Sequence, residues 1–352
     1  MPRPFVRAHC AIPFAALPFL AGACTHPDPF GPRSLGTPRD LAAATAVAAG
    51  DLDGDGDDSL VLIQDEVATW GDQRLELGGL AQVVARGDVD GDGLDEILLG
   101  CGMGRGSPRA PARVWLIDQE GSRLLWERDG ARNQVSDLRV LPVGLWMATF
   151  ADGRRVEGGW LRPVPDGGPW QLETVLDVSL GLEQMPLGDR VLVGRVYGDE
   201  PRSDGDLRAW KDGAWTPLPS LRGVRSLAHG DLGRHGEQDL LVGDGWHYRY
   251  GSQAVGRVRL LHGPDWKTGR TIASFDGEFS ARELAVVGQG LDAWILVTAS
   301  ENAHVLARDG LGWQDLLVAA VGEQGMAVPA RLDGQAGVLV SGDPARWVPV
   351  LR

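Results

Sequence analysis

The chain has 352 residues and a formal net charge of −14, and it contains 50 glycines, 22 prolines and three cysteines. This length is enough for one large or two ordinary domains with a sizeable core. The acidic balance argues against a nucleic-acid partner, because phosphate binding needs a basic surface, whereas acidic chains attract cations. Abundant glycine with scattered, non-periodic proline excludes collagen and indicates many tight turns between short strands.

Residues 1–23 have the features of a secretory signal peptide. Arg3 and Arg7 precede an apolar stretch that is too short and too rich in proline for a comfortable membrane span. The end of this stretch, Leu20-Ala21-Gly22-Ala23-Cys24, resembles the lipobox of bacterial lipoproteins, although its leucine lies one position further from the cysteine than the lipobox prefers. The resemblance implies that Cys24 carries lipid and anchors the protein to the cell envelope, at the outer membrane or cell surface. The alternative is ordinary signal cleavage near Ala23, which would leave a secreted or periplasmic protein.

Residues 24–40 are predicted to combine the lipidated cysteine with a flexible tether. The segment is polar and rich in proline and glycine, and it shows no periodicity. We expect contact with the membrane only through the lipid. If Cys24 is lipidated and Cys10 is removed, Cys101 is the remaining cysteine and cannot form an intrachain disulfide.

Residues 41–352 consist of short apolar runs bounded by Gly, Asp or Pro, which predict strands and turns. The runs recur in units of four strands, with Asp/Gly turns after the first strand. We count seven such turns, near Asp51, Asp88, Asp137, Asp189, Asp231, Gly288 and Asp333. This rhythm predicts an all-β, seven-bladed β-propeller of four-stranded blades, with six or eight blades as alternatives. The last unit is one strand short, and a strand near residues 33–45 could complete it and close the ring.

Two turns concentrate carboxylates at alternate positions. They read GDLDGDGDDS over residues 50–59 and ARGDVDGDGLDEILLG over residues 85–100. Alternate acidic side chains before a glycine supply the oxygen ligands that Ca²⁺ prefers. The pattern D-x-D-x-D-G-x-x-D before an apolar strand resembles the calcium loops of FG-GAP/VCBS repeats, which form integrin-alpha-like propellers. The resemblance implies Ca²⁺ as cofactor, and we assign its ligands as Asp51, Asp53, Asp55, Asp88, Asp90, Asp92 and Glu96.

The two loops differ at the ninth position of the pattern. The second loop has Glu96 there, but the first has Ser59, so Asp57 or Asp58 would have to substitute. The alternative for either loop is a solvated acidic turn without metal. The corresponding turn of the fifth unit keeps Asp231 and Asp239 but lacks carboxylates between them, so we expect it to be free of metal. Calcium is therefore expected to support only the early blades.

The sequence shows no catalytic constellation, because neither G-x-S-x-G nor H-E-x-x-H occurs. We expect a monomeric, calcium-stabilised binding module for protein or glycan ligands at the cell surface. The alternatives are a propeller enzyme of the polysaccharide lyase or hydrolase type, and a purely structural envelope protein. An enzyme should gather titratable side chains with perturbed pKa values in the axial pocket, whereas a binding module should expose an aromatic or charged rim.

The long connections between second and third strands define a candidate ligand face. In a four-stranded meander these connections lie opposite the first turn, and therefore opposite the calcium loops. The candidate ligand-binding residues there are Tyr197, Trp246, His247, Tyr248, Arg249 and Tyr250. Tyr, Trp and Arg are common binding anchors. The alternative is that Trp246, Tyr248 and Tyr250 alternate along an extended strand and pack against a neighbouring blade.

Overall fold

The protein is all-β in the described part of the chain. The computed structural model describes residues 33–103, 110–130, 133–151, 155–179, 181, 183–196, 205–218, 221, 223–232, 239–245, 255–263, 265–275, 281–310, 312–322 and 325–351. Antiparallel strands dominate these residues, and the helical element among them is one short 3-10 turn, Gly290–Asp292. No helix in the described ranges has the length and apolar character that crossing a membrane requires. The prediction of an all-β fold is confirmed.

Four separate sheets each contain four antiparallel strands in chain order. The first has β3 (Ala46–Gly50), β4 (Ser59–Gln64), β5 (Val67–Trp70) and β6 (Gln73–Glu76). The second has β15 (Glu183–Leu187), β16 (Arg190–Gly194), β17 (Leu207–Lys211) and β18 (Ala214–Pro217). The third has β19 (Ser226–Gly230), β20 (Asp239–Asp244), β21 (Gly256–Leu261) and β22 (Gly269–Phe275). The fourth has β23 (Glu283–Val287), β24 (Trp294–Thr298), β25 (Asn302–Asp309) and β26 (Gly312–Ala320).

An eight-stranded sheet contains two further groups of four strands. One group is β7 (Leu80–Gly87), β8 (Glu96–Gly102), β9 (Ala112–Asp118) and β10 (Gly121–Arg128). The other is β11 (Gln134–Leu141), β12 (Gly144–Ala151), β13 (Arg155–Arg162) and β14 (Gln171–Ser179). The groups are joined by one residue pair, Gln134 with Gly102. A Cβ atom on Gly102 would lie 2.4 Å from the Cα of Gln134, so the absence of a side chain permits this contact.

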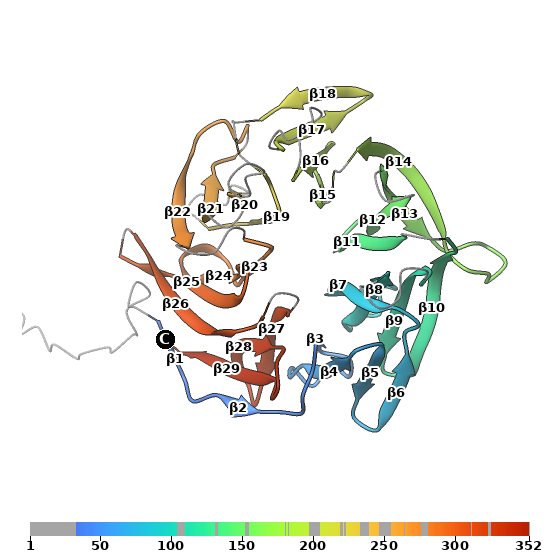
Figure 1. Cartoon of the computed structure of the whole chain (residues 1–352), viewed down its shortest axis with the longest axis horizontal. Coiled ribbons are helices and arrows are strands. Elements are labelled where there is room, and N and C mark those ends of the chain that lie inside the picture. Colours follow the sequence, from blue (N-terminus) through green and yellow to red (C-terminus); the bar gives the residue numbers. More distant parts are fainter. Residues whose placement is uncertain are drawn as a thin grey trace, which may run out of the picture.

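The sheets lie around a common centre, with the first strand of each four-strand group innermost (Figure 1). The second strands β8, β20 and β24 are buried along their whole length. Their sequences, EILLGCG, DLLVGD and WILVT, are nearly continuous apolar runs, as expected for strands covered on both faces. Cys101 is a free, buried thiol in β8, and burial raises its pKa to about 12.

The last sheet joins the two ends of the described chain. It contains β27 (Ala327–Leu332), β28 (Gln335–Val340) and β29 (Arg346–Leu351), and the N-terminal strands β1 (Ser34–Leu35) and β2 (Arg39–Asp40) pair with β29. Backbone hydrogen bonds from Gly36 to Pro349 and from Leu41 to Ala345, each 2.8 Å, extend this pairing. A closing strand near residues 33–45 was anticipated from the sequence.

The pairing also changes the expected tether. Sequence composition placed residues 24–40 in a flexible segment, but residues 34–40 lie along β29. The reason is that β29 offers an unpaired edge whose backbone groups need partners. The signal peptide and Cys24 lie outside the described residues.

We predict that deleting residues 33–40 lowers the free energy of unfolding by about 2–4 kcal/mol, because several backbone hydrogen bonds to β29 are lost and its edge is exposed. Chemical denaturation of the two proteins measures the difference. Deletion of residues 25–32 is the matched control. Equal stability of the 33–40 deletion and the full chain would show that β1 and β2 do not contribute to closure.

Candidate functional site

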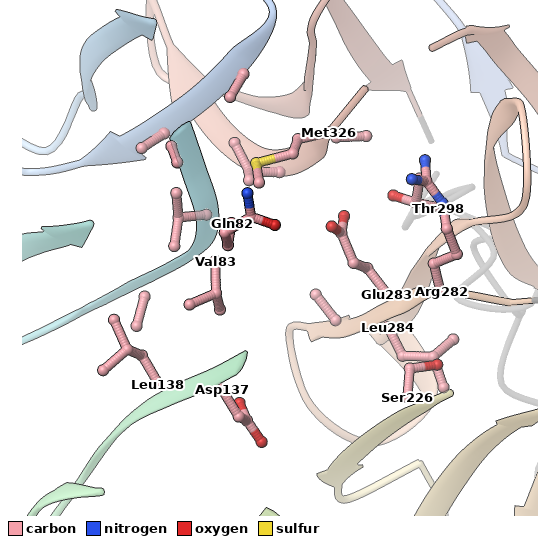
Figure 2. Close-up of a pocket in the computed structure, with 18 of the residues that line it drawn as sticks. Gln82, Val83, Asp137, Leu138, Ser226, Arg282, Glu283, Leu284, Thr298 and Met326 are labelled. Atoms are coloured by element: carbon pink, nitrogen blue, oxygen red, sulfur yellow. The ribbon is translucent and has the colours of Figure 1, made fainter. Parts of the chain in front are cut away.

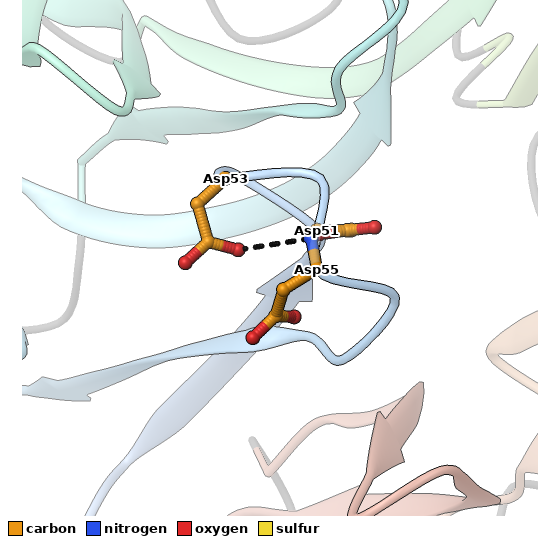
Figure 3. Close-up of side chains that lie close together, drawn as sticks. All are labelled: Asp51, Asp53 and Asp55. Atoms are coloured by element: carbon orange, nitrogen blue, oxygen red, sulfur yellow. Dashed lines mark hydrogen bonds between the residues drawn. The ribbon is translucent and has the colours of Figure 1, made fainter.

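The first acidic loop connects β3 to β4 and is organised by its own carboxylates. The Asp51 carboxylate accepts hydrogen bonds from the backbone N–H groups of Gly54 (2.9 Å) and Gly56 (3.1 Å). Asp53 accepts from Asp55 N–H at 3.3 Å, as Figure 3 shows. Gly54 and Gly56 have φ values of 74° and 90°, a region that favours glycine. Gly at these positions therefore allows the loop to fold around Asp51.

The second loop, between β7 and β8, repeats this framework position by position. Asp88 accepts from Gly91 N–H (2.6 Å) and Gly93 N–H (3.0 Å), and these glycines have φ values of 86° and 90°. Asp90 accepts from Asp92 N–H at 3.2 Å, and Asp92 accepts from Leu94 N–H at 2.8 Å. Two loops with the same spacing therefore adopt the same turn.

Each loop brings three carboxylates together. Carboxylate oxygens of Asp51, Asp53 and Asp55 lie within 4.8 Å of one another, and the same holds for Asp88, Asp90 and Glu96. Asp92 belongs to the second loop but not to its close group. Such oxygen clusters match the ligand preference of Ca²⁺ and suit soft metals poorly.

Glu96 is the buried member of the second cluster. Glu96 is the first residue of β8 and is 2% exposed. Its carboxylate accepts a hydrogen bond from Val89 N–H at 2.6 Å. Burial raises the pKa of Glu96, and the neighbouring loop carboxylates raise it further. The second loop thus has a ninth-position carboxylate that lies in the cluster, as the sequence pattern indicated.

Neither Asp57 nor Asp58 belongs to the close carboxylate group of the first loop. Asp58 is 9% exposed, pairs with Arg86 at 3.0 Å and accepts from the backbone N–H of Arg331 at 2.6 Å. Asp57 accepts from Gly334 N–H at 2.7 Å. Both side chains contact neighbouring elements, and the close group of the first loop consists of three aspartates. The substitution that the sequence suggested stays a prediction.

The turn of the fifth unit lies partly outside the described residues, because residues 233–238 are not described. The turn keeps two aspartates of the calcium-loop pattern, Asp231 and Asp239. Asp239 is buried at the start of β20 and pairs with Nδ1 of His262 at 3.0 Å. The expectation of a metal-free turn there stays a prediction. The candidate ligand-face residues Tyr197, Trp246, His247, Tyr248, Arg249 and Tyr250 also lie outside the described residues, so their arrangement stays a prediction as well.

A cavity of about 1080 Å³ lies at the centre of the molecule and is lined by residues of the innermost strands β3, β7, β11, β15, β19, β23 and β27. Figure 2 shows Gln82 from β7, Asp137 from β11 and Glu283 from β23 projecting into this space. The sequence placed Asp137 near a turn. It lies instead inside β11, and the turn follows at Pro142 and Val143. This turn contains no aspartate, so the search for an Asp/Gly turn pointed to Asp137 instead.

Arg139 organises the charged side of the cavity. Its Nε donates to Asp137 at 3.0 Å and its Nη2 donates to Glu183 at 3.2 Å. These nitrogens share one edge of the planar guanidinium, so the two carboxyl groups are held side by side. Asp137 also accepts from Gln184 N–H at 2.9 Å, and Nη1 of Arg139 reaches the carbonyl of Leu227 at 3.1 Å. The network connects three innermost strands.

The cavity acids have raised pKa values. Burial raises the pKa of Glu183 well above its ordinary value, and the negative charge of Asp137 adds to this effect. Burial also raises the pKa of Asp137 and of Glu283, partly opposed by Arg139 and Arg282 respectively. The sequence analysis did not predict this group of cavity acids, Asp137, Glu183 and Glu283. The signal that could have indicated it is the presence of charged residues in otherwise apolar first strands, as in VSDLRV over residues 135–140.

A scan against protein-family models finds no match to this chain, and a search of curated proteins finds no match either.

We predict that the free energy of unfolding falls as the pH rises from 4.5, the ordinary pKa of a glutamate, to values above the raised pKa of Glu183. The folded state then binds more protons than the unfolded state, so deprotonation favours unfolding. The charged groups that act on Glu183 are Asp137, Arg139, Arg225 and Glu283. Urea denaturation at several pH values measures the slope.

Glu183→Gln should flatten this slope, because the substitution removes the titrating proton. Glu76→Gln on the exposed strand β6 is the matched control and should leave the slope unchanged. A slope that is the same in Glu183→Gln and in the unaltered protein would contradict the prediction.

Proposed function

We propose that this protein is a calcium-stabilised, seven-bladed β-propeller of the FG-GAP/VCBS type that serves as a binding module at the bacterial cell envelope. The observation that supports it best is the repeated loop geometry: two sequence-matched turns hold carboxylates in the same hydrogen-bond framework. The shared turn brings three carboxylates within 4.8 Å of one another in each loop, and such an oxygen cluster suits Ca²⁺.

The blade assignment follows the four-strand groups. Blades one to six are β3–β6, β7–β10, β11–β14, β15–β18, β19–β22 and β23–β26, and blade seven is β27–β29 completed by β1 and β2. We count the eight-stranded sheet as two blades because a single residue pair joins its halves. The arrangement of the groups around one centre supports this count (Figure 1).

Calcium would act where blade seven meets blades one and two. The first loop contacts the β27–β28 turn through Asp57 and Gly334, and it contacts the second loop through a 3.2 Å hydrogen bond from Asp95 N–H to the carbonyl of Asp51. Without a cation the clustered carboxylates repel one another. Neutralising this repulsion stabilises the junction and provides a rigid support for binding loops.

The preferred partner is a protein or glycan of the envelope, and the axial cavity supports a binding role. A propeller enzyme acting on polysaccharide is the second candidate, favoured by the neighbouring carboxyl groups of Asp137 and Glu183 and their raised pKa values. Shortening of a bound polysaccharide would distinguish the enzyme from the binding module. If the protein binds neither protein nor glycan, a purely structural role in the envelope is the remaining alternative.

We predict that millimolar Ca²⁺ raises the melting temperature and that a chelator lowers it. A site filled at 100 times its Kd contributes about 2.7 kcal/mol. Asp90→Asn should remove more of this shift than Asp53→Asn, because only the second loop includes a ninth-position carboxylate in its cluster. Both substitutions keep the Oδ1 acceptor that the loop backbone uses. The control is Asp72→Asn, and identical melting curves in Ca²⁺ and chelator would refute the calcium proposal.

For the location we predict that Cys24 carries lipid and that the mature protein partitions into the membrane fraction. Cys24→Ser should release it as a soluble periplasmic or secreted protein, and mass spectrometry of the mature N-terminus should detect the lipid. Cys101→Ser is the matched control, because Cys101 is buried in β8. If the Cys24 variant fractionates like the unaltered protein, the lipid anchor is wrong.

A further inference from the structure

The axial cavity has two chemically different sides. On β11, β15, β19 and β23, or immediately before them, lie the charged residues Asp137, Arg139, Glu183, Arg225, Arg282 and Glu283. The side formed by β27, β3 and β7 presents mainly small and apolar residues, including Ala46, Ala48, Val83 and Val328. The polar lining residues Thr45, Asp65 and Arg86 on that side lie at strand ends, and Gln82 lies within β7.

The polar side has three carboxyl groups and three guanidiniums, so its charges balance at a pH above the raised pKa values of the carboxyl groups. Arg139 pairs with Asp137 and Glu183. The positive charge of Arg225 acts on Glu183 and Glu283, and Arg282 acts on Glu283. A ligand with a net charge would bring an uncompensated charge beside this balanced set, which is costly where the charges are partly desolvated. A neutral ligand disturbs this balance least.

Glu283 is the carboxylate best placed to meet a ligand. The Asp137 and Glu183 carboxyl groups are held by Arg139, whereas the Glu283 carboxylate projects into the space between β23 and β7, where the Gln82 amide also projects (Figure 2). Burial raises the pKa of Glu283, and Thr298 and the backbone of Ala327, which lie beside it, partly oppose this shift. A carboxylate has about four acceptor positions, so these contacts leave capacity for ligand donors.

Hydroxyl groups fit this lining, because each can donate to a carboxylate and accept from a guanidinium or an amide. The C–H faces of sugar rings fit the apolar side. The volume of about 1080 Å³ is slightly above the usual range of ligand pockets, which span about 300–1000 Å³, so the space accommodates a ligand of several sugar rings. We propose that the axial cavity binds a neutral, polyhydroxylated ligand of the short-oligosaccharide class, with Glu283 accepting hydrogen bonds from its hydroxyl groups. The inference rests on the proposed binding function and names its ligand class.

The test uses two pairs of trisaccharides whose members share a sugar backbone and differ in charge through loss of an acetyl or a methyl group. Chitotriose is neutral and its deacetylated form is cationic, whereas methyl-esterified trigalacturonate is neutral and the free acid is anionic. Isothermal titration of the full mature chain in Ca²⁺ should show binding of at least one neutral member and weaker binding of its charged counterpart. Loss of one hydrogen bond to a charged group in Glu283→Gln should weaken that binding by about 10- to 100-fold.

Glu283→Gln keeps the side-chain shape, and the raised pKa of Glu283 indicates that a neutral group is tolerated there, so the variant should retain its melting temperature and calcium response. Glu76→Gln on β6 is the matched control and should bind like the unaltered protein. Preference for a charged trisaccharide, undiminished binding by Glu283→Gln, or no binding of either neutral member at millimolar concentration would overturn the cavity proposal.

A parallel screen against envelope glycans and envelope proteins separates this inference from the proposed function. If the unaltered protein and Glu283→Gln bind an envelope partner equally, the binding function stands and the cavity assignment fails. If the unaltered protein binds nothing in either assay, both fail.

Discussion

The pairing of β1 and β2 with β29 is the constraint on which the rest of the structure depends. It joins residues near the two ends of the described chain and covers the edge of the last sheet. Sheets arranged around one centre bury their faces against each other only if the last one meets the first. Asp58 strengthens this meeting point, because its buried carboxylate binds Arg86 of β7 and the backbone of Arg331 in β27.

The acidic loops belong to the same junction. The first loop contacts the β27–β28 turn and the second loop, so repulsion among its carboxylates is felt at the place where the ring closes. Under the proposed function, a bound cation and the closure of the ring stabilise each other. The described cysteine, Cys101, is a free thiol, so a bound cation would supply the kind of stabilisation that disulfides give many secreted proteins.

Local chemistry explains which features could be predicted from the sequence. The alternating aspartates and the glycines at positive φ act within a few residues of each other, so their spacing alone indicated the turn and its clusters. The buried second strands were equally visible as apolar runs. Asp58 could not be assigned, because its backbone partner Arg331 is 273 residues away. The same holds for the axial cavity, whose charged side is assembled from residues as distant as Asp137 and Glu283.

The charged side of the cavity is difficult to explain by stability alone. Buried ion pairs and carboxyl groups with raised pKa values commonly contribute little to folding, and apolar replacements of similar size are often neutral or stabilising. The innermost strands β3 and β27 line the same centre with mainly apolar residues, in the sequences AVAAG and AVPARL. Because the fold lines part of its centre with alanine and valine, the ligand contact proposed above accounts for Asp137, Glu183 and Glu283 better than stability does.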